Sequence, residues 1–144
     1  NFDKYTSHVI PAMIAKFNDA KKKNKKSVEL FGTGKPLREF LYNDDLSEAI
    51  FMLLKLSKNK IMNKCINDFP IFNIGTGRNI SIKNLANLIS KKINYKGRII
   101  FNSYYPDGTK KKDLNSQKIR SLGWKPKITL EKGIDIILKK KFNV

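Results

Sequence analysis

Two short apolar segments of this chain each run into the same Gly-Thr-Gly turn, at "VELFGTG" (residues 28–34) and at "IFNIGTG" (71–77). Glycine adopts the backbone conformations that tight turns require, so each segment is expected to be a strand that ends at its turn. "REFLYNDD" (38–45) predicts further extended chain, and "RIIFNS" (98–103) predicts another strand. These strands alternate with helical patterns, which indicates the α/β class.

About five helices are expected around these strands. Apolar residues recur at helical spacing in residues 9–17, 46–54, 82–89 and 129–142. A short helix that ends at a glycine is expected in residues 116–123. Ser7, Asp45 and Ser81 each stand where a side chain can cap a helix, and Glu48 completes a capping-box spacing with Asp45. Pro11 falls in the first turn of its helix, where a missing N–H costs little.

Length and composition fit one domain with a substantial core, because the chain has 144 residues of which 40% are hydrophobic. No apolar run is long enough to span a bilayer and no signal-peptide pattern opens the sequence, so the cytoplasm is the expected location. The one cysteine, Cys65, excludes an internal disulfide. One cysteine with one histidine also excludes the usual zinc clusters, so no metal is expected.

The formal net charge is +18. It points to a polyanionic partner: nucleic acid, an acidic membrane or a phosphate-bearing small molecule. The alternative is that many lysines only solvate the surface, since the chain is rich in Lys, Asn and Ile together, as an AT-rich genome would encode. Aromatic residues do not interleave with the basic clusters, and no helix-turn-helix, zinc-finger, RRM or KH signature is present. Both observations disfavour nucleic-acid binding.

Few residues carry a chemical signal by themselves. Neither glycine turn forms a G-x-G-x-x-G that opens a helix or the G-K-[ST] of a P-loop, and no Tyr-x-x-x-Lys or Ser-His-Asp set occurs. Arg38, just after the first turn, can fork onto a phosphate or form a surface salt bridge. Asp44 and Asp45 form either a carboxylate pair or a helix cap. His8, the only histidine, is either a reagent or an ordinary residue at a helix start.

Four segments, taken in order, resemble the C-terminal half of the GDP-L-fucose synthase family, whose members are extended short-chain dehydrogenases/reductases of Rossmann type. They are "NFDKYTSHVIPAMIAKF", "VELFGTGKPLREFLYNDDLSEAI", "FNIGTGRNISIKNLANLI" and "YKGRIIFNSYYPDGTKKKDLNSQKIRSLGWKPKITLEKGI". "SHVIPA" and the "PDGT…K" loop are the more specific parts. "REFLYNDD" and "FNIGTG" recur across many nucleotide-sugar epimerases and dehydratases.

The resemblance implies roles for six residues of this chain. His8 occupies the position of the family's epimerisation acid, which also lies near the nicotinamide cofactor, and an imidazole suits proton transfer near neutral pH. The implied substrate contacts are Lys16, where an arginine meeting the diphosphate is common; Phe31, where a tryptophan is common; Arg38, on the diphosphate; and Asp107 and Lys112, in the nucleotide-contacting loop. Cys65 does not match the family's catalytic cysteine.

The family converts GDP-4-keto-6-deoxy-D-mannose to GDP-L-fucose by epimerising C3 and C5 and reducing C4 with NADPH. On this resemblance, residues 1–144 form a single substrate-binding domain. The N-terminal NADP-binding domain, with the cofactor loop and the Tyr/Lys pair, is absent from the chain, which is expected to be inactive alone. The intact enzyme is expected to be a homodimer. A related nucleotide-sugar epimerase/reductase and a basic RNA- or DNA-binding module are the alternatives.

Overall fold

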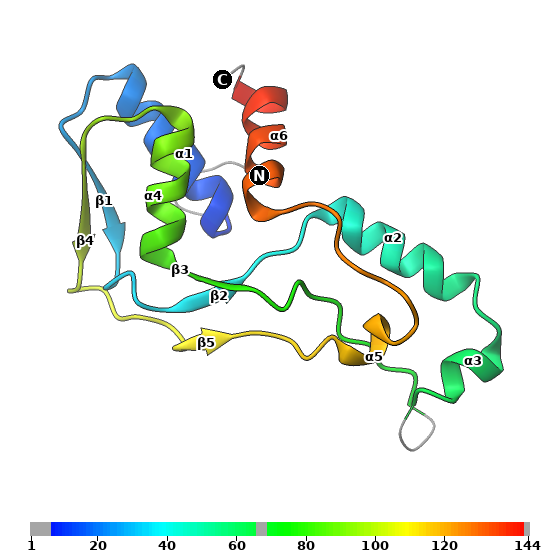
Figure 1. The fold of residues 1–144 in the computed structure, drawn as a ribbon. Helices are drawn as coiled ribbons and strands as arrows, with labels where there is room; N and C mark the ends of the chain where they lie inside the picture. The colour runs from blue at the N-terminus through cyan, green and yellow to red at the C-terminus, as the bar shows by residue number, and fades with distance from the viewer. Residues whose placement is uncertain (1–6, 66–68, 143–144) are drawn as a thin grey trace. The chain divides into compact units, whose positions relative to one another are not determined.

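The computed structural model describes residues 7–65 and 69–142, and it is a mixed α/β structure (Figure 1). Contacts within the chain form two compact units. Unit 1 contains the described residues of 1–38, 80–111 and 134–144, and unit 2 contains those of 39–79 and 112–133. The α/β class is therefore confirmed, whereas the expectation of one domain over residues 1–144 stays a prediction.

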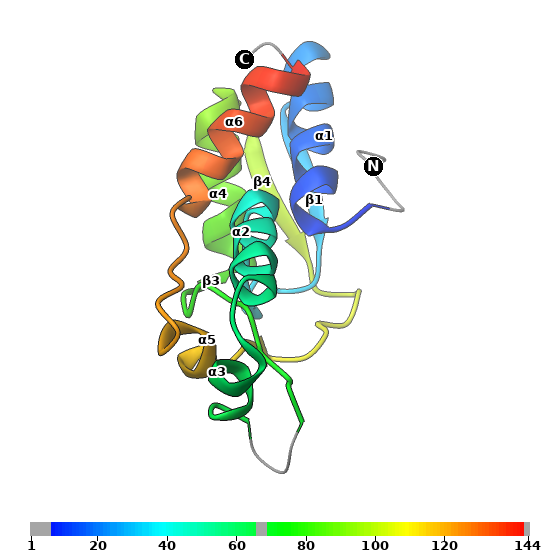
Figure 2. The same ribbon diagram turned by 90° about the vertical axis from the view of Figure 1, so that its right-hand side faces the viewer.

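Unit 1 is built on two parallel strands, β1 (Ser27–Phe31) and β4 (Arg98–Asn102), which pair with Val28 opposite Ile99 and Leu30 opposite Phe101. Helix α1 (Val9–Lys22) packs against β1 and against helix α4 (Ile82–Ile93), as Figures 1 and 2 show. Parallel strands need a crossover connection, and α4 lies in the chain between these two. The predicted strands at 28–34 and 98–103 and both helices are thus confirmed.

The core of unit 1 lies between these helices and β1. Its buried apolar residues are Met13, Ile14, Phe17 and Ala20 of α1, Val28 and Leu30 of β1, Leu85, Ala86, Ile89 and Ile93 of α4, and Ile134 and Leu138 of α6 (Leu130–Phe142). The ring of Tyr95 lies 5.6 Å from that of Phe17 between centroids, and its hydroxyl donates to the carbonyl of Lys25. Burial raises the pKa of the Tyr95 hydroxyl.

The helix starts agree with the predicted caps in one case of three. The Ser81 hydroxyl accepts a hydrogen bond from the N–H of Asn84 at the start of α4, as predicted. Helix α1 has His8 rather than Ser7 at its N-cap position, and that residue makes no side-chain cap, so the predicted Ser7 cap is wrong. Pro11 lies in the first turn of α1, as expected.

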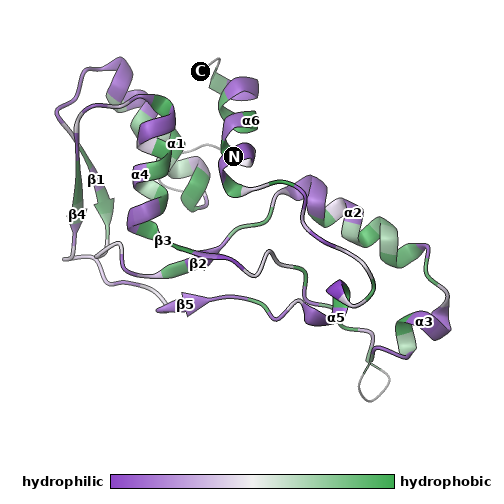
Figure 3. Cartoon of the chain, viewed as in Figure 1, coloured by the Kyte–Doolittle hydropathy of each residue, from purple (hydrophilic) through white to green (hydrophobic). Residues whose placement is uncertain are grey.

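Unit 2 contains three helices: α2 (Asn43–Leu54), α3 (Lys58–Met62) and α5 (Gln117–Arg120). The buried members of its small core are Ala49 of α2, Ile119 of α5 and Trp124. Among the described residues the chain has six helices, and α3 is the one that the sequence did not predict. The second half of α2 is hydrophobic (Figure 3), and Phe51 and Leu54 are 62% and 77% exposed there.

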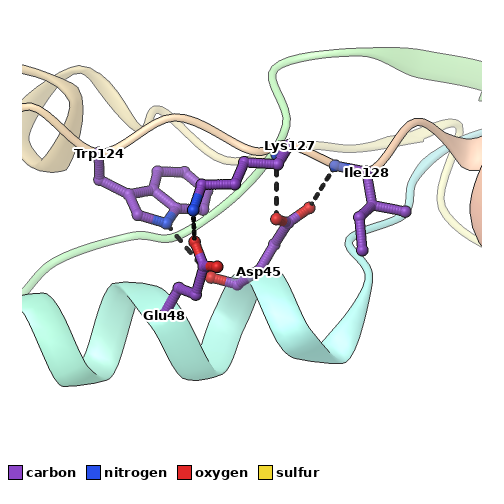
Figure 4. A network of polar contacts seen from close by, with 5 residues as sticks. All are labelled: Asp45, Glu48, Trp124, Lys127 and Ile128. Atoms are coloured by element: carbon purple, nitrogen blue, oxygen red, sulfur yellow. Dashed lines mark hydrogen bonds and ion pairs between the residues drawn. The ribbon is translucent and has the colours of Figure 1, made fainter.

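Asp45 does not cap α2, so that prediction is wrong. The helix begins at Asn43, with Tyr42 at the N-cap, and Asp45 lies within the first turn, where it is buried. Its two carboxylate oxygens accept the backbone N–H groups of Lys127 and Ile128, each at 3.0 Å (Figure 4). The carboxylate therefore fastens a loop that is distant in sequence to the helix, because those two N–H groups lie outside any helix or strand.

Two strand predictions also need correction. Residues 71–77 form no strand. Near its two ends, this segment is held by side chains of unit 2: the carbonyl of Ile71 accepts from the Lys118 ammonium and that of Thr76 from the Arg120 guanidinium. The predicted extended stretch 38–45 contributes a strand only within β2 (Leu37–Glu39), before α2 begins. With β3 (Asn79–Ser81) and β5 (Lys111–Lys112), β2 makes a small sheet in the order β3-β2-β5.

Within residues 7–65 and 69–142, none of the helices has both the length and the apolar character to cross a bilayer.

Candidate substrate-binding site

A cavity of about 290 Å³ opens within unit 1. It is lined by α1, the end of β1, the Gly-Thr-Gly turn that follows, Arg38, the first residue of α4 and the loop 106–108. Four of the six residues singled out by the resemblance line it together: Lys16, Phe31, Arg38 and Asp107. These residues come from four separate segments, so the fold, and not their spacing in the sequence, brings them together.

Lys16 faces the cavity from the middle of α1. Its ammonium lies 4.6 Å from the centroid of the Phe31 ring, which is cation–π distance. Burial lowers the pKa of the Lys16 ammonium, and the negative charge of Glu29 partly opposes that effect. A cation that has lost part of its hydration in this way is well suited to pair with an incoming anion.

Phe31 belongs to a cluster of three exposed aromatic rings. The Tyr105 ring stacks on it, with centroids 4.0 Å apart and planes at 29°. Tyr104 in turn meets Tyr105 edge to face, at 6.1 Å. The three rings remain 53%, 42% and 90% exposed in the order Phe31, Tyr105, Tyr104. Exposed aromatic surface of this kind, beside a cationic cavity, is typical of a site that binds a planar ligand group.

Arg38 is held by carbonyl groups on one side only. Its Nη1 donates to the carbonyls of Leu37 and Thr109, each at 2.7 Å. Within the described residues Nη2 and Nε have no hydrogen-bond partner. An arginine fixed through one nitrogen leaves the rest of its planar fork to bind the oxygens of a phosphate.

Asp107 fastens its loop to the first Gly-Thr-Gly turn. Its Oδ1 accepts the N–H of Thr33 at 2.8 Å, and its Oδ2 accepts the Thr33 hydroxyl at 2.5 Å. These hydrogen bonds from the Thr33 hydroxyl and N–H lower the pKa of the Asp107 carboxyl, with smaller contributions from Lys35 and Arg38. We call this pair of bonds the Thr33–Asp107 clamp. Gly32 has φ of +80°, and a Cβ there would overlap the Asp107 carboxylate.

The other two predicted site residues lie elsewhere. His8 is exposed at the N-cap of α1, between Ser7 and Val9, which both line the cavity. Lys112 belongs to unit 2, where it lines a different pocket of about 260 Å³ with Glu39 and Gly75. The roles assigned to all six residues stay predictions.

The second Gly-Thr-Gly turn, in unit 2, is also filled by a carboxylate. Oε1 of Glu39 accepts the N–H of Gly77 at 2.6 Å and the Thr76 hydroxyl at 3.3 Å. A Cβ at Gly75 would overlap the same oxygen. Both turns thus hold internal carboxylates where a phosphate cradle would need open N–H groups. The residues of these turns do not fit the phosphates of a dinucleotide cofactor, in agreement with the absence of a nucleotide motif.

Sequence reasoning overlooked Thr33 and Tyr105. The repeated Gly-Thr-Gly pattern was a usable signal for Thr33, because the same residue type between two glycines suggests the same local role. Tyr105 carries no spacing signal. In the part of the chain that the structure describes, no three His, Cys, Asp or Glu side chains come together as metal ligands would.

Comparison with known proteins identifies the family. Residues 1–75 match the family described as "NAD dependent epimerase/dehydratase family". The chain belongs to this family. The match includes Lys16, Phe31 and Arg38, whereas the loop 106–108 on the other side of the cavity lies outside it.

Several proteins to which this chain is similar have names that refer to GDP-sugars. The chain is 40% identical over 133 residues to GDP-L-fucose synthase of Sinorhizobium fredii, covering 92% of this chain and 40% of that protein. Its fold is similar to that of a GDP-6-OMe-4-keto-L-xylo-heptose reductase of Campylobacter jejuni, with a TM-score of 0.84, 33% identity, and coverage of 97% of this chain and 49% of that one. A GDP-mannoheptose C4 reductase from the same organism, solved with NADP bound, gives a TM-score of 0.80 at 32% identity, over 97% and 48%.

These comparisons confirm the predicted resemblance and the expected fold of an extended short-chain dehydrogenase. The chain spans about two fifths of the length of the curated relative and about half of each solved structure.

Proposed function

We propose that this chain is the substrate-binding part of an NADP-dependent GDP-L-fucose synthase, the 3,5-epimerase/4-reductase that converts GDP-4-keto-6-deoxy-D-mannose to GDP-L-fucose. The observation that carries the proposal is the cavity of unit 1, in which Lys16, Arg38 and Phe31 meet. Two cations and an aromatic ring match the two phosphates and the base of a nucleoside diphosphate. The similarity to GDP-L-fucose synthase of Sinorhizobium fredii supports GDP as that nucleotide.

The diphosphate is assigned to Arg38 and Lys16. Arg38 binds through the edge of its fork that no described carbonyl occupies, and Lys16 adds a point charge from α1. Although the net charge is +18, the proposal gives a ligand-binding role to only three basic residues: Lys16, Arg38 and Lys112. The remaining lysines need no ligand to explain them.

His8 is assigned to proton transfer during epimerisation. Epimerisation next to a ketone requires one group to remove a proton from carbon and another to return a proton on the opposite face. At each of C3 and C5 a base in the part of the intact enzyme that this chain does not cover removes the proton, and the His8 imidazolium donates one proton to the opposite face. The imidazole is then neutral and takes a proton from water before the second carbon is protonated. About two helical turns, or roughly 12 Å, separate His8 from Lys16 along α1. This separation leaves room for a hexose between the imidazole and the diphosphate.

The C4 reduction needs a hydride from NADPH, and the two Gly-Thr-Gly turns of this chain do not fit the phosphates of that cofactor, because carboxylates fill them. We assign the cofactor to the part of the intact enzyme that the curated relatives have and this chain does not cover, with His8 as the expected contact from this side. The chain by itself is then inactive. A cytoplasmic, homodimeric enzyme is part of the same proposal, and sedimentation of the intact protein tests the dimer.

Calorimetry on the intact protein tests the substrate class. GDP-sugar is expected to bind more tightly than UDP-sugar, and Arg38→Ala is expected to weaken GDP binding. RNA binding that falls steeply with salt, without affinity for any nucleotide sugar, would instead identify a nucleic-acid-binding module. A positively charged surface by itself binds GDP and UDP equally well. A preference for GDP therefore distinguishes a nucleotide-sugar enzyme from a nucleic-acid-binding module.

A related GDP-sugar C4 reductase is the second candidate, because both Campylobacter jejuni structures are named as reductases of GDP-sugars and one of the names specifies C4. The intact enzyme is incubated with the 4-keto substrate in D₂O without NADPH. An epimerase exchanges the protons at C3 and C5, and a pure reductase exchanges neither. His8→Gln is expected to suppress this exchange. Exchange at the wild-type rate in that variant would remove His8 from its assigned role.

A further inference from the structure

We propose that Thr33 is a positioning residue for nucleotide binding, which acts through the Thr33–Asp107 clamp on the loop 104–109. This inference rests on the proposed function and deepens it. Thr33 and Asp107 are 74 residues apart in the sequence, so the clamp joins two segments that no local interaction would hold together. Its consequence is that the binding surface for the nucleoside diphosphate is formed before the ligand arrives.

The clamp uses every polar group that Thr33 can offer in that direction. The hydroxyl donates to Asp107 and at the same time accepts the N–H of Lys35 at 3.2 Å, while the Thr33 N–H donates to the other carboxylate oxygen. A hydroxyl that accepts one bond is a better donor in the next, so the two bonds support each other. Valine has nearly the same shape as threonine and cannot make either hydroxyl bond.

The clamped loop carries two contacts with residues assigned to the ligand. Tyr105, two residues before Asp107, stacks on Phe31. Thr109, two residues after it, accepts the hydrogen bond that orients the Arg38 guanidinium. Loss of the clamp is therefore expected to loosen both the Tyr105 ring that stacks on Phe31 and the Arg38 guanidinium that faces the phosphates. Ordering such a loop upon binding reduces affinity, whereas a loop ordered beforehand avoids that loss.

Direct binding of the diphosphate by Asp107 is unfavourable. A carboxylate and a phosphate are both negative near neutral pH and repel each other. Both carboxylate oxygens of Asp107 already accept hydrogen bonds from Thr33. The carboxylate also lies so close to Gly32 that a Cβ on that residue would overlap it. Its place in the cavity wall is accounted for by the clamp. We therefore assign Asp107 a positioning role through the clamp, and the nucleotide contact that the family resemblance implies for it stays a prediction.

The second Gly-Thr-Gly turn supplies a matched control within the same chain. Thr76 donates its hydroxyl to Glu39 as Thr33 does to Asp107. Neither threonine lines the cavity. Glu39 follows Arg38 in β2, but the hydrogen bonds that hold the Arg38 guanidinium go to the carbonyls of Leu37 and Thr109, and Thr109 belongs to the loop that Thr33 fastens. Thr33→Val and Thr76→Val delete the same chemical group from the same kind of turn. Only the first substitution is predicted to affect nucleotide binding.

The experiment measures GDP binding by calorimetry and steady-state kinetics with the GDP-4-keto sugar, using the intact enzyme that carries this chain. Thr33→Val is expected to raise the Kd for GDP and the KM about tenfold, the effect of roughly one lost hydrogen bond, with kcat nearly unchanged. Thr33→Ser, which keeps the hydroxyl, is expected to stay within about twofold of the wild type, as is Thr76→Val.

The outcomes separate this inference from the proposed function. Wild-type protein that binds neither GDP nor the GDP-sugar overturns both. Wild-type binding with an unchanged Kd in Thr33→Val overturns the clamp alone, as does an equal rise in Thr76→Val. Should Thr33→Val fail to fold, Asp107→Asn tests the same bonds, since its amide accepts through one oxygen only. An unchanged Kd in Asp107→Asn likewise contradicts the proposal.

Discussion

Thr33 donates two hydrogen bonds to Asp107, one from its N–H at 2.8 Å and one from its hydroxyl at 2.5 Å. The carboxylate therefore fills a glycine turn where a phosphate-binding loop would present open N–H groups. Glu39 fills the second Gly-Thr-Gly turn in the same way. A glycine turn next to a strand can either bind a phosphate or accept a carboxylate of the same chain. In both turns of this chain the carboxylate occupies the N–H groups. The nucleotide is instead assigned to side chains around the first turn.

The first prediction concerns the acid side of the clamp. Thr33 lowers the pKa of Asp107, so Thr33→Val is expected to raise that pKa toward its ordinary value of about 3.9. Because the folded-state pKa is depressed, the clamp contributes stability that is present above pH 4 or so and is lost as pH falls through the lowered pKa. Carbon-detected NMR titration of the Asp107 carboxyl measures this directly. Equal pKa values in wild type and Thr33→Val would contradict the assignment.

The second prediction concerns Lys16 at alkaline pH. Burial lowers the Lys16 pKa below its ordinary value of 10.5, so its positive charge is lost earlier as pH rises than that of an exposed lysine. GDP affinity is expected to decline on the alkaline side accordingly. Lys16→Arg keeps its charge throughout this range and should bind GDP with a flatter profile and at least equal affinity, through two parallel bonds. Calorimetry from pH 7 to 10 compares the two proteins, and parallel declines would exclude Lys16 as the titrating group.

The sequence predicted correctly those helices and strands that are marked by residues close to one another in the chain. The apolar spacing of α1 and α4, the Ser81 cap and the β1 and β4 strands all follow from residues close in sequence. The predicted strand at 71–77 is absent, and the contacts that hold this segment come from far along the chain: Lys118 and Arg120, more than 40 residues away, donate to the carbonyls of Ile71 and Thr76. The five-residue helix α3 has no buried residue, so no amphipathic pattern marks it.

The site shows the same limit. The resemblance singled out Lys16, Phe31 and Arg38, and the fold places them in one cavity. The clamp could not be read from the sequence, because threonine and aspartate 74 residues apart carry no pairing signal. The contact between Tyr105 and Phe31 is equally remote in sequence. Residues that touch a ligand are recognisable by type, whereas residues that position them depend on tertiary structure.

The third prediction separates backbone strain from the clamp. Gly32→Ala places a side chain at φ of +80° and against the Asp107 carboxylate. Gly123→Ala meets the same kind of strain at φ of +99°, but nothing lies within 4 Å of its Cβ. Each is expected to lower the free energy of unfolding by about 1–2 kcal/mol through the backbone. Only Gly32→Ala should also weaken GDP binding, as measured by calorimetry, and an equal loss in Gly123→Ala would argue against the clamp.

The fourth prediction concerns the buried carboxylate of unit 2. Asp45 is 2% exposed and accepts the N–H groups of Lys127 and Ile128, 82 and 83 residues further along the chain. Asp45→Ala leaves both donors without their partner, which is expected to lower the free energy of unfolding by about 2–3 kcal/mol. Asp45→Asn keeps one acceptor and should lose less. Denaturant titration of the three proteins measures the difference.

Glu48 provides the control for this site, one turn along the same helix (Figure 4). Its carboxylate pairs with the Lys127 ammonium at 2.6 Å, but the two side chains are 50% and 69% exposed. Exposed ion pairs contribute little, because water screens them and both side chains must be ordered, so Glu48→Ala is expected to change the free energy of unfolding by about 0.5 kcal/mol or less. The Trp124 indole bonds to the Asp45 carbonyl, which both alanine variants retain. Equal losses in Asp45→Ala and Glu48→Ala would therefore show that the buried backbone contacts are not what fastens the loop 124–128 to α2.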